Sequence, residues 1–222
     1  YLYPWVFLAT APAVRQFHAE RGIPDDVSWA TLADFGLHMA IHQRTYGVGG
    51  LGTSNWLTLH FRGAIYRLGR LQFNRSRVRH DADAIESAGG TFRTGDPALG
   101  VHIPEIGPLT PDACDASFRW APDFFARHFP EDTIAVATCG SWLLDEQLAA
   151  YLPAGSNIVR FQQRFRRLPG GNVSDDSIVQ FVFRRVKPEL DDLPQRTTLE
   201  RAIVAHLRAG NHWYSRTGWV AL

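Results

Sequence analysis

The chain has 222 residues, of which 45% are hydrophobic and 20% are charged, a composition typical of a globular protein with one sizeable core. Its 23 basic and 22 acidic side chains give a formal net charge of +1, so no general electrostatic attraction to nucleic acid or to an acidic membrane is expected. No apolar run approaches the roughly 20 residues of a membrane span. Cys114 and Cys139 lie far apart without a CxxC pattern, which predicts free thiols and a cytoplasmic location.

The first part of the chain is predicted to be helical. Apolar residues recur at helical spacing over 5–21, with a break near Pro12, and again over 28–46, where Ser28 stands in the N-cap position. A glycine-rich turn over 47–52 follows. We therefore expect a helical segment over residues 1–50 and a second domain over 51–222. Because the sequence does not begin with Met, we also expect residues before Tyr1.

A β-hairpin is predicted next. The run WLTLHF over 56–61 is rich in residues that favour strands, Arg62 and Gly63 supply a turn, and residues 64–73 form the returning strand. Residues 74–98 are polar and glycine-rich, and little regular structure is expected there.

The most informative stretch is GVHIPEIGPLT, residues 100–110. A short apolar strand enters a loop that contains Pro104, Gly107 and Pro108, and an amphipathic helix begins near Thr110 and extends to about Arg127. The first turn of a helix has free backbone N–H groups and a favourable dipole, so this arrangement suits an anionic group such as the pyrophosphate of a CoA-like molecule. The loop has neither a dinucleotide fingerprint nor a P-loop spacing.

Strands and helices alternate in the remainder of the chain. We expect a strand over 133–138, a helix over about 143–152, a helix from Asn157 capped by Ser156, a strand over 177–184, a helix over 198–208 and a final strand or hairpin over 212–222. The order predicts a mixed α/β (α+β) sheet flanked by helices and preceded by the helical segment.

Several of these segments together resemble one bacterial family, the GNAT-like acyltransferases that carry a helical N-terminal domain. The resembling segments are YRLGRLQF (66–73), HIPEIGPLT (102–110), CGSWLLDEQL (139–148), SNIVRFQQRF (156–165) and HLRAGNHWYSRTGW (206–219). The resemblance implies a mixed, mostly antiparallel sheet in which two parallel strands splay apart to hold acyl-CoA. It identifies 101–104 as the first splayed strand and 133–138 as the second.

The resemblance also implies the residues that bind the acyl donor. They are Ile103, Ile106, Gly107, Leu109, Thr110, Cys139 and Arg160. The glycine pattern of common acetyltransferase loops is absent, and Pro108 removes one N–H donor. An acyl-phosphopantetheine group on a carrier protein is therefore an alternative donor to acyl-CoA. Arg160 belongs to a basic cluster that could contact the CoA 3′-phosphate, a carrier protein or an acidic acceptor, or could simply face solvent.

Transfer of an acyl group to an amine needs a base, a stabilised carbonyl oxygen and, in some cases, a proton for the thiolate. Glu105 and His102 are candidate bases, with a solvated loop carboxylate and a packed strand histidine as the alternatives. Ser141 is a candidate catalytic hydroxyl or a helix cap, and Tyr151 a candidate proton donor or a core tyrosine. Cys139 is interpreted as pocket-lining, with a nucleophile as the alternative.

Asp34, His38 and His42 share one helical face and could bind a metal, but no HExxH or cysteine cluster accompanies them, so we interpret them as a polar face and expect no metal. Our first hypothesis is an N-acyltransferase that acts on a small-molecule or peptide amine by direct attack. The alternatives are a non-catalytic acyl-CoA or acyl-carrier binding module and a metal-dependent hydrolase.

Overall fold

The structure is a computed structural model that describes residues 2–186 and 188–222. Its centre is a seven-stranded sheet in the order β1-β2-β3-β4-β7-β5, with β6 paired to β7. The strands are β1 (Ile65–Leu68), β2 (Leu71–Arg77), β3 (Pro97–His102), β4 (Val136–Ser141), β5 (Arg166–Arg167), β6 (Asn172–Val173) and β7 (Tyr214–Ala221). The β3–β4 pair is parallel and the other strand pairs among the described residues are antiparallel, as the family resemblance implied.

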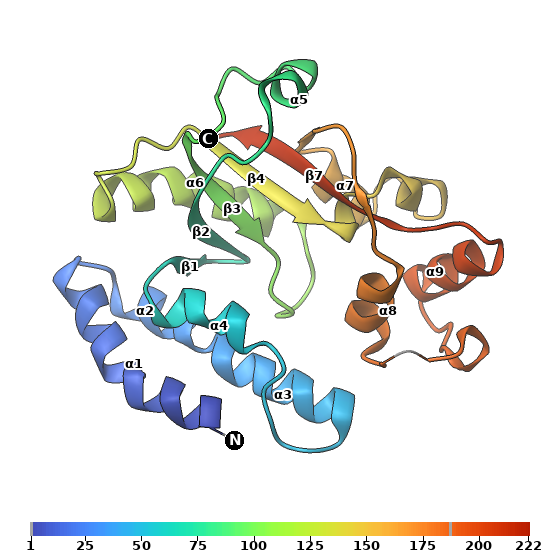
Figure 1. Ribbon diagram of the computed structural model, residues 1–222, viewed down its shortest axis with the longest axis horizontal. Coiled ribbons are helices and arrows are strands. Elements are labelled where there is room, and N and C mark those ends of the chain that lie inside the picture. The colour runs from blue at the N-terminus through green and yellow to red at the C-terminus, as the bar shows by residue number, and fades with distance from the viewer. Residues whose placement is uncertain (1, 187) are drawn as a thin grey trace.

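Helices surround this sheet. They are α1 (Leu2–Glu20), α2 (Asp25–Leu32), α3 (Asp34–Tyr46), α4 (Ser54–Phe61), α5 (Ala82–Ser87), α6 (Pro111–His128), α7 (Asn157–Gln162), α8 (Asp175–Phe183) and α9 (Thr198–Arg208), with 3-10 turns η1 (Trp142–Leu144), η2 (Glu146–Ala150) and η3 (Leu190–Asp192). In Figure 1 the N-terminal helices lie below β1–β3. Helices α8 and α9 lie at the right, beyond the C-terminal end of β4 and the N-terminal end of β7. None of the helices described is long and apolar enough to cross a bilayer.

The main core lies between α6 and the sheet. Phe73 of β2, Leu99 and Val101 of β3 and Phe125 of α6 are almost completely buried there. Side chains alternate along β3, so Leu99 and Val101 face the core, and Gly100 and His102 face the opposite side of the sheet. The order of elements from β3 to α6 is the strand, loop and helix predicted from residues 100–127.

Two predicted strands are helices in the structure. Residues 56–61 belong to α4, and 177–184 fall largely in α8. Both runs are short and apolar, and such runs can form either element. The hairpin turn consequently lies at Gly69 and Arg70, with Leu68 opposite Leu71, and not at Arg62 and Gly63.

Other boundaries also differ from the prediction. Helix α1 continues through Pro12, and the predicted helix over 28–46 is divided into α2 and α3. The expected helix over 143–152 consists of two 3-10 turns, and residues 74–98 contain part of β2 and the short helix α5. Helix α9 spans 198–208 as predicted, and β7 lies within the predicted 212–222 segment.

Candidate acyl-donor site

The site begins where the two parallel strands separate. Only Leu99–Ala137 and Gly100–Thr138 pair in the β3–β4 ladder, although β3 continues to His102 and β4 to Ser141. A cavity of about 550 Å³ opens at this separation. Main-chain groups on the two facing edges no longer bond to each other there, so they are available to a ligand.

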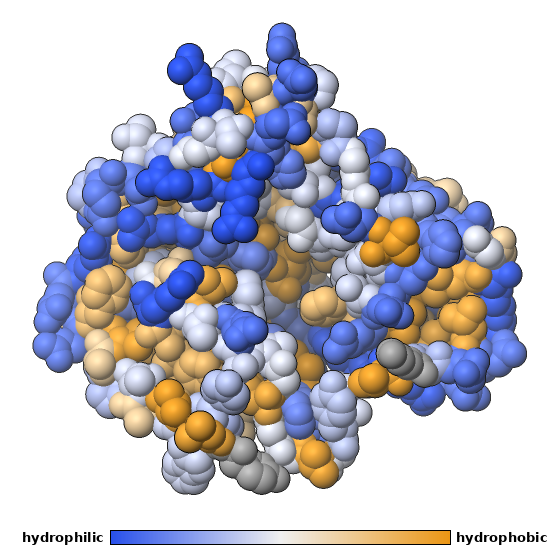
Figure 2. All heavy atoms as spheres, in the orientation of Figure 1, coloured by the Kyte–Doolittle hydropathy of each residue, from blue (hydrophilic) through white to orange (hydrophobic). Residues whose placement is uncertain are grey.

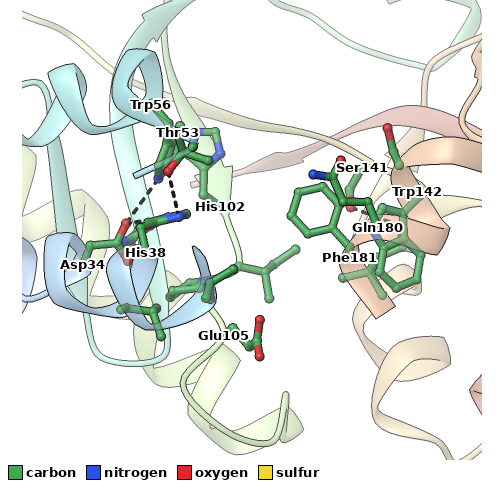
Figure 3. A pocket seen from close by; sticks show the side chains of 18 of the residues that line it. Asp34, His38, Thr53, Trp56, His102, Glu105, Ser141, Trp142, Gln180 and Phe181 are labelled. Atoms are coloured by element: carbon green, nitrogen blue, oxygen red, sulfur yellow. Dashed lines mark hydrogen bonds and ion pairs between the residues drawn. The ribbon is translucent and has the colours of Figure 1, made fainter. Parts of the chain in front are cut away.

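Elements far apart in the sequence line this cavity. The lining comprises residues of α3 (Asp34, Leu37, His38, Ile41, His42, Thr45, Tyr46), of the segment 52–56 (Gly52, Thr53, Trp56), of β2–β3 and its loop (Gln72, Val101–Glu105), of β4–η1 (Cys139–Leu143), of α8 and its flanks (Ser174, Ser177, Gln180, Phe181, Arg184) and of β7 (Ser215). Figure 2 shows a hollow between the N-terminal helices and α8 with apolar side chains in its depth. Figure 3 shows His38, Trp56 and His102 on one side of the cavity and Ser141, Trp142 and Phe181 on the other.

Arg70 fixes the loop that follows β3. Its guanidinium donates to the carbonyl oxygens of Pro104 at 2.9 Å, Gly107 at 2.9 Å and Pro108 at 3.0 Å. Burial lowers the pKa of Arg70, but a guanidinium stays protonated in proteins. The turn that carries Arg70 is itself held on α6, because Ser117 Oγ accepts from the backbone N–H of Arg70 at 3.0 Å. Three loop carbonyls are thus directed toward one side chain.

The loop leads to an uncapped helix start. Thr110 is the N-cap residue of α6, yet its side chain makes no capping hydrogen bond. Among the residues described, no hydrogen bond is made by the backbone N–H groups of Leu109, Thr110, Asp112 or Ala113. Free N–H groups at a helix start favour an anionic ligand.

Basic residues of α7 and of the segment that follows it lie close to this helix start. Arg164 donates to the carbonyl oxygen of Pro111 at 2.9 Å and pairs with Asp115 at 2.7 Å. The same guanidinium donates to the carbonyl oxygen of Arg160 at 2.8 Å. Within the described part of the chain Arg160 has no ion pair, and it is exposed. The backbone of Arg160 is therefore close to the start of α6, because its carbonyl oxygen and that of Pro111 accept from the same guanidinium.

The predicted donor-binding residues fall into two groups. Ile103 and Cys139 line the cavity, whereas Ile106, Gly107, Leu109 and Thr110 lie beyond it in the loop before α6. The side chain of Leu109 is buried in the main core. Its available group is the backbone N–H.

His102 lies at the end of β3 with its ring partly buried against the cavity. Its Nε2 is 2.6 Å from Oδ1 of Asn74, and the Trp56 ring packs edge-on at 4.5 Å between centroids. Burial, reinforced by nearby His60 and opposed by Asp34, lowers the pKa of His102 to about 4. The imidazole is neutral at physiological pH, so it can accept a proton.

Asp34 is the centre of a buried polar cluster beside His102. Its Oδ2 lies 3.1 Å from His60 Nε2 and 3.2 Å from both His38 Nε2 and Trp56 Nε1. Burial alone would raise the pKa of Asp34, but hydrogen bonds from His38 and His60 outweigh it and lower the pKa. The carboxylate is charged and connects α3 to α4.

Glu105 stands at the edge of the cavity between two arginines. Oε1 pairs with Arg44 of α3 at 2.8 Å, and Oε2 pairs with Arg184 at the end of α8. Both oxygens are engaged, and the carboxylate connects three segments. Glu105 is therefore better suited to a structural role between these segments than to the role of a base.

The remaining predicted site residues are separated. Ser141 lines the cavity, and its Oγ accepts from the N–H of Leu143, which is the capping role weighed from the sequence. Cys139 lines it too, but burial raises the pKa of its thiol to about 12, so the nucleophilic thiolate is disfavoured. Tyr151 is not a lining residue, and its hydroxyl is bonded to His206 at 2.9 Å.

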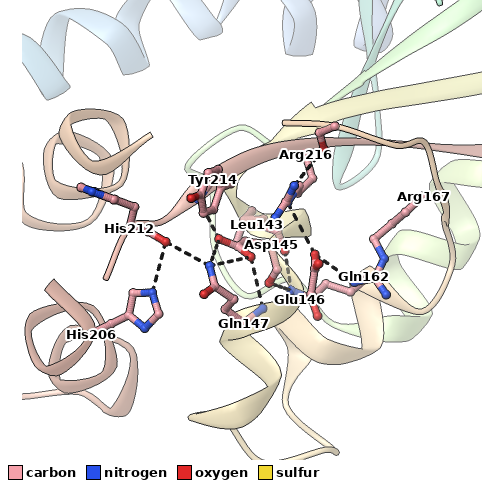
Figure 4. Close-up of polar contacts among 11 residues, drawn as sticks. Leu143, Asp145, Glu146, Gln147, Gln162, Arg167, His206, His212, Tyr214 and Arg216 are labelled. Carbon is pink, nitrogen blue, oxygen red and sulfur yellow. Dashed lines mark hydrogen bonds and ion pairs between the residues drawn. The ribbon is translucent and has the colours of Figure 1, made fainter. Parts of the chain in front are cut away.

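Figure 4 shows the neighbouring polar network, in which the Asp145 carboxylate accepts from the backbone and side-chain nitrogens of Gln147 and from the backbone N–H of Tyr214.

The helical face proposed as an alternative metal site is divided between two environments. Asp34 and His38 join the buried cluster, whereas His42 Nδ1 lies 3.1 Å from the carbonyl oxygen of Val48 and its ring packs on Tyr46. Across residues 2–186 and 188–222, no three potential ligands are grouped to hold a metal ion.

Sequence reasoning missed Arg70, Asn74 and His60. Arg70 stands in a turn, Asn74 on a polar stretch and His60 on a run interpreted as a strand, so no local pattern distinguishes them. Gly100 was placed just before the predicted strand over 101–104, whereas in the structure it lies inside β3, where a glycine indicates close approach of another group.

Residues 1–63 match the N-acyltransferase N-terminal domain, and residues 65–220 match the GNAT-like C-terminal domain. Among curated proteins no relative matched.

The chain is similar to solved acyltransferase structures over its entire length. One, in complex with decanoyl-CoA and teicoplanin, is 49% identical with a TM-score of 0.89; another, in complex with CoA and 10C-teicoplanin, is 48% identical with a TM-score of 0.90. The chain spans 66% of the length of each of these proteins. The two domain matches and these identities, together with the splayed β3–β4 pair, show that the chain belongs to the GNAT-like acyltransferase family with a helical N-terminal domain.

Proposed function

We propose that this protein is an N-acyltransferase that moves an acyl group from acyl-CoA to an amine by direct attack. The observation that carries the proposal is the cavity at the β3–β4 separation, joined to an uncapped helix start through a loop held by Arg70. The solved relatives bind CoA or decanoyl-CoA, which favours acyl-CoA over a carrier-bound acyl group as donor.

We assign the pyrophosphate to the loop and to the N–H groups at the start of α6, with Ile106, Gly107, Leu109 and Thr110 around it. Arg160 is the cation we assign to a phosphate of CoA. The thioester would then extend between Ile103 and Cys139 into the cavity, where N–H groups on the parted strand edges polarise its carbonyl.

His102 is the base that we favour. It is neutral and faces the cavity, whereas both oxygens of Glu105 are committed to ion pairs. In the reaction, the amine nitrogen attacks the thioester carbon, and the C–S bond breaks as the tetrahedral intermediate collapses. The amine proton passes to His102, and Ser141 is the hydroxyl we assign to hydrogen-bond the departing thiolate. The position of Tyr151 gives it no direct contact with this cavity.

The acceptor we propose is an amine on a peptide-based small molecule, of the kind represented by the teicoplanin bound to a relative. The wall opposite His102, which includes Trp142 and Phe181, offers apolar and aromatic surface to such a ligand. We propose a cytoplasmic site of action, and we propose the division into a helical segment over 1–50 and a GNAT-like domain over 51–222.

The direct test measures release of free CoA thiol from decanoyl-CoA with and without an amine-bearing glycopeptide. We expect thiol release that depends on the acceptor, together with a product heavier by one acyl group. His102→Gln should reduce kcat by about 10²- to 10⁴-fold, which is the usual contribution of a general base. The control is His80→Gln, because the His80 imidazole makes no hydrogen bond within the described residues. Tight CoA binding without turnover would instead support a non-catalytic binding module.

A further inference from the structure

A side chain on the neighbouring strand contacts the histidine proposed as base. Strands β2 and β3 are antiparallel, with Asn74 opposite Gly100 and Gln72 opposite His102. The Asn74 side chain extends along this face of the sheet until its Oδ1 lies 2.6 Å from His102 Nε2.

The orientation of the Asn74 amide follows from its second hydrogen bond. Nδ2 lies 3.0 Å from the carbonyl oxygen of Arg75, and a carbonyl oxygen can only accept. Nδ2 therefore faces Arg75, and Oδ1 faces the imidazole. Because Oδ1 is also only an acceptor, the hydrogen of the neutral imidazole resides on Nε2 and the lone pair resides on Nδ1.

Gly100 provides the space that the Asn74 side chain occupies. A Cβ atom at this position would overlap with Asn74 Oδ1 and lie 3.1 Å from its Cγ, which requires the amide to move, and it would also lie 3.3 Å from His102 Nε2. The backbone of Gly100 is not in the left-handed region, so conformational freedom is not the reason for glycine here. The reason is the close approach of Asn74.

We propose that Asn74, seated in the space left by Gly100, is a positioning residue that holds His102 in the Nε2–H tautomer with Nδ1 free to accept the amine proton. The proposal rests on the proposed role of His102 as base. In histidines generally, the hydrogen bond made by one ring nitrogen determines whether the other ring nitrogen carries a hydrogen or a lone pair.

Among the described residues, Asn74 is the single hydrogen-bond partner of the His102 side chain. Trp56 of α4 covers the ring edge-on. The titratable groups that face this region are Asp34 and His38 of α3 and His60 of α4, and these belong to the cluster centred on Asp34. Asn74 is therefore the contact whose removal frees the imidazole to change tautomer.

The test is a double-mutant cycle between Asn74→Ala and Gly100→Ala, followed by steady-state kinetics of acyl transfer. Each single variant should lower kcat by about 10- to 100-fold with little change in KM for the donor, a loss typical of a removed orienting partner. The added methyl group of Gly100→Ala displaces Asn74 and also approaches His102 Nε2, at 3.3 Å. Because both contacts fall on the same hydrogen bond, the losses in the double variant should be less than additive. Additive losses would overturn the proposal.

Two further readouts exclude a purely structural effect. Nitrogen chemical shifts of the His102 imidazole should report the Nε2–H form in the parent protein and a mixture of forms in Asn74→Ala. Asn74→Asp should restore the tautomer, but its carboxylate favours the imidazolium form and raises the pKa of His102. The acid limb of kcat/KM should consequently move to higher pH. An unmoved acid limb together with unchanged shifts in Asn74→Ala would count against a positioning role.

The matched control is Ser76→Ala, since Ser76 lies on the same face of β2 and, among the described residues, its hydroxyl bonds only to the carbonyl oxygen of Ala98, at 3.3 Å. It should leave kcat unchanged. The outcomes also distinguish the two proposals. Full turnover in His102→Gln would show that His102 is not the base. An inactive His102→Gln together with a fully active Asn74→Ala would contradict only the positioning role of Asn74.

Discussion

At the scale of single residues, the site depends on polar contacts that join distant positions. Glu105 was predicted as a candidate base because it follows the first splayed strand, and that position is correct. Its ion pairs with Arg44 and Arg184 come from partners 61 and 79 residues away, and no local pattern reveals them. Sequence reasoning therefore located the carboxylate and could not establish its environment.

Arg70 provides the first residue-scale prediction. Arg70→Gln removes a guanidinium that holds the carbonyl oxygens of Pro104, Gly107 and Pro108. Charge-assisted hydrogen bonds contribute roughly 1.5–3 kcal/mol each, and part of this energy orders the loop. We expect the Kd for CoA to rise by about 10- to 100-fold, measured by isothermal titration calorimetry.

The control for this measurement is Arg67→Gln. The Arg67 guanidinium donates to one carbonyl oxygen, that of Gly69, within the same turn. Its removal should leave the Kd for CoA almost unchanged. Equal Kd values for the parent and Arg70→Gln would mean that the loop does not depend on Arg70 for donor binding.

At the scale of elements, the sequence predicted best where one strong local signal is present. The strand, loop and helix around residues 97–128 combine an apolar strand, a proline and glycine loop and a long amphipathic helix. The run over 56–61 has the composition of a strand but forms α4, where Leu57 is fully buried. Packing against neighbouring elements outweighs intrinsic preference in such short runs.

The loop before α6 provides the element-scale prediction. Gly107 has φ of 126°, a conformation that residues with a side chain adopt only with strain, yet a Cβ there would meet no atom within 4 Å. Gly107→Ala should therefore act through backbone strain of about 1–3 kcal/mol and not by filling space. We expect weaker CoA binding and a slightly lower Tm, measured by calorimetry and thermal unfolding.

Gly155→Ala is the matched control, because a Cβ at Gly155 also meets no atom within 4 Å and the backbone there is not left-handed. It should leave both quantities unchanged. Parent-like CoA affinity in Gly107→Ala would show that the loop conformation is not needed for donor binding.

At the scale of the whole molecule, the cavity exists only because the N-terminal helices pack beside the sheet. Helix α3 supplies Asp34 and His38 to one wall, and Arg44 reaches Glu105 in the loop after β3. Farther from the cavity, Nδ1 of His18 in α1 lies 2.8 Å from Oγ of Ser28 in α2, and the His18 ring packs on Tyr66 of β1. Such long-range contacts arise from tertiary packing, so periodicity along the sequence could not predict this wall.

The same packing gives the molecule an acid-sensitive stability. His18 is completely buried, and burial together with Arg15 lowers its pKa to about 4; the pKa of His102 is lowered, chiefly by burial, to a similar value. Between the ordinary histidine pKa near 6.5 and about 4, the unfolded chain binds a proton at each position and the folded protein does not. Each histidine should therefore lower the free energy of unfolding by about 1.4 kcal/mol per pH unit as the pH falls.

His18→Gln should remove one of these two contributions, so the slope of unfolding free energy against pH should fall by about 1.4 kcal/mol per pH unit in that window. Urea unfolding at several pH values between 4 and 6.5 measures it. The slope is informative even if loss of the bond to Ser28 lowers stability at every pH. The control variant is His80→Gln, because the His80 imidazole makes no hydrogen bond within the described residues, and this variant should keep the parent slope. A parent slope in His18→Gln would mean that His18 is protonated in the folded protein, which would contradict its neutral burial between α2 and β1.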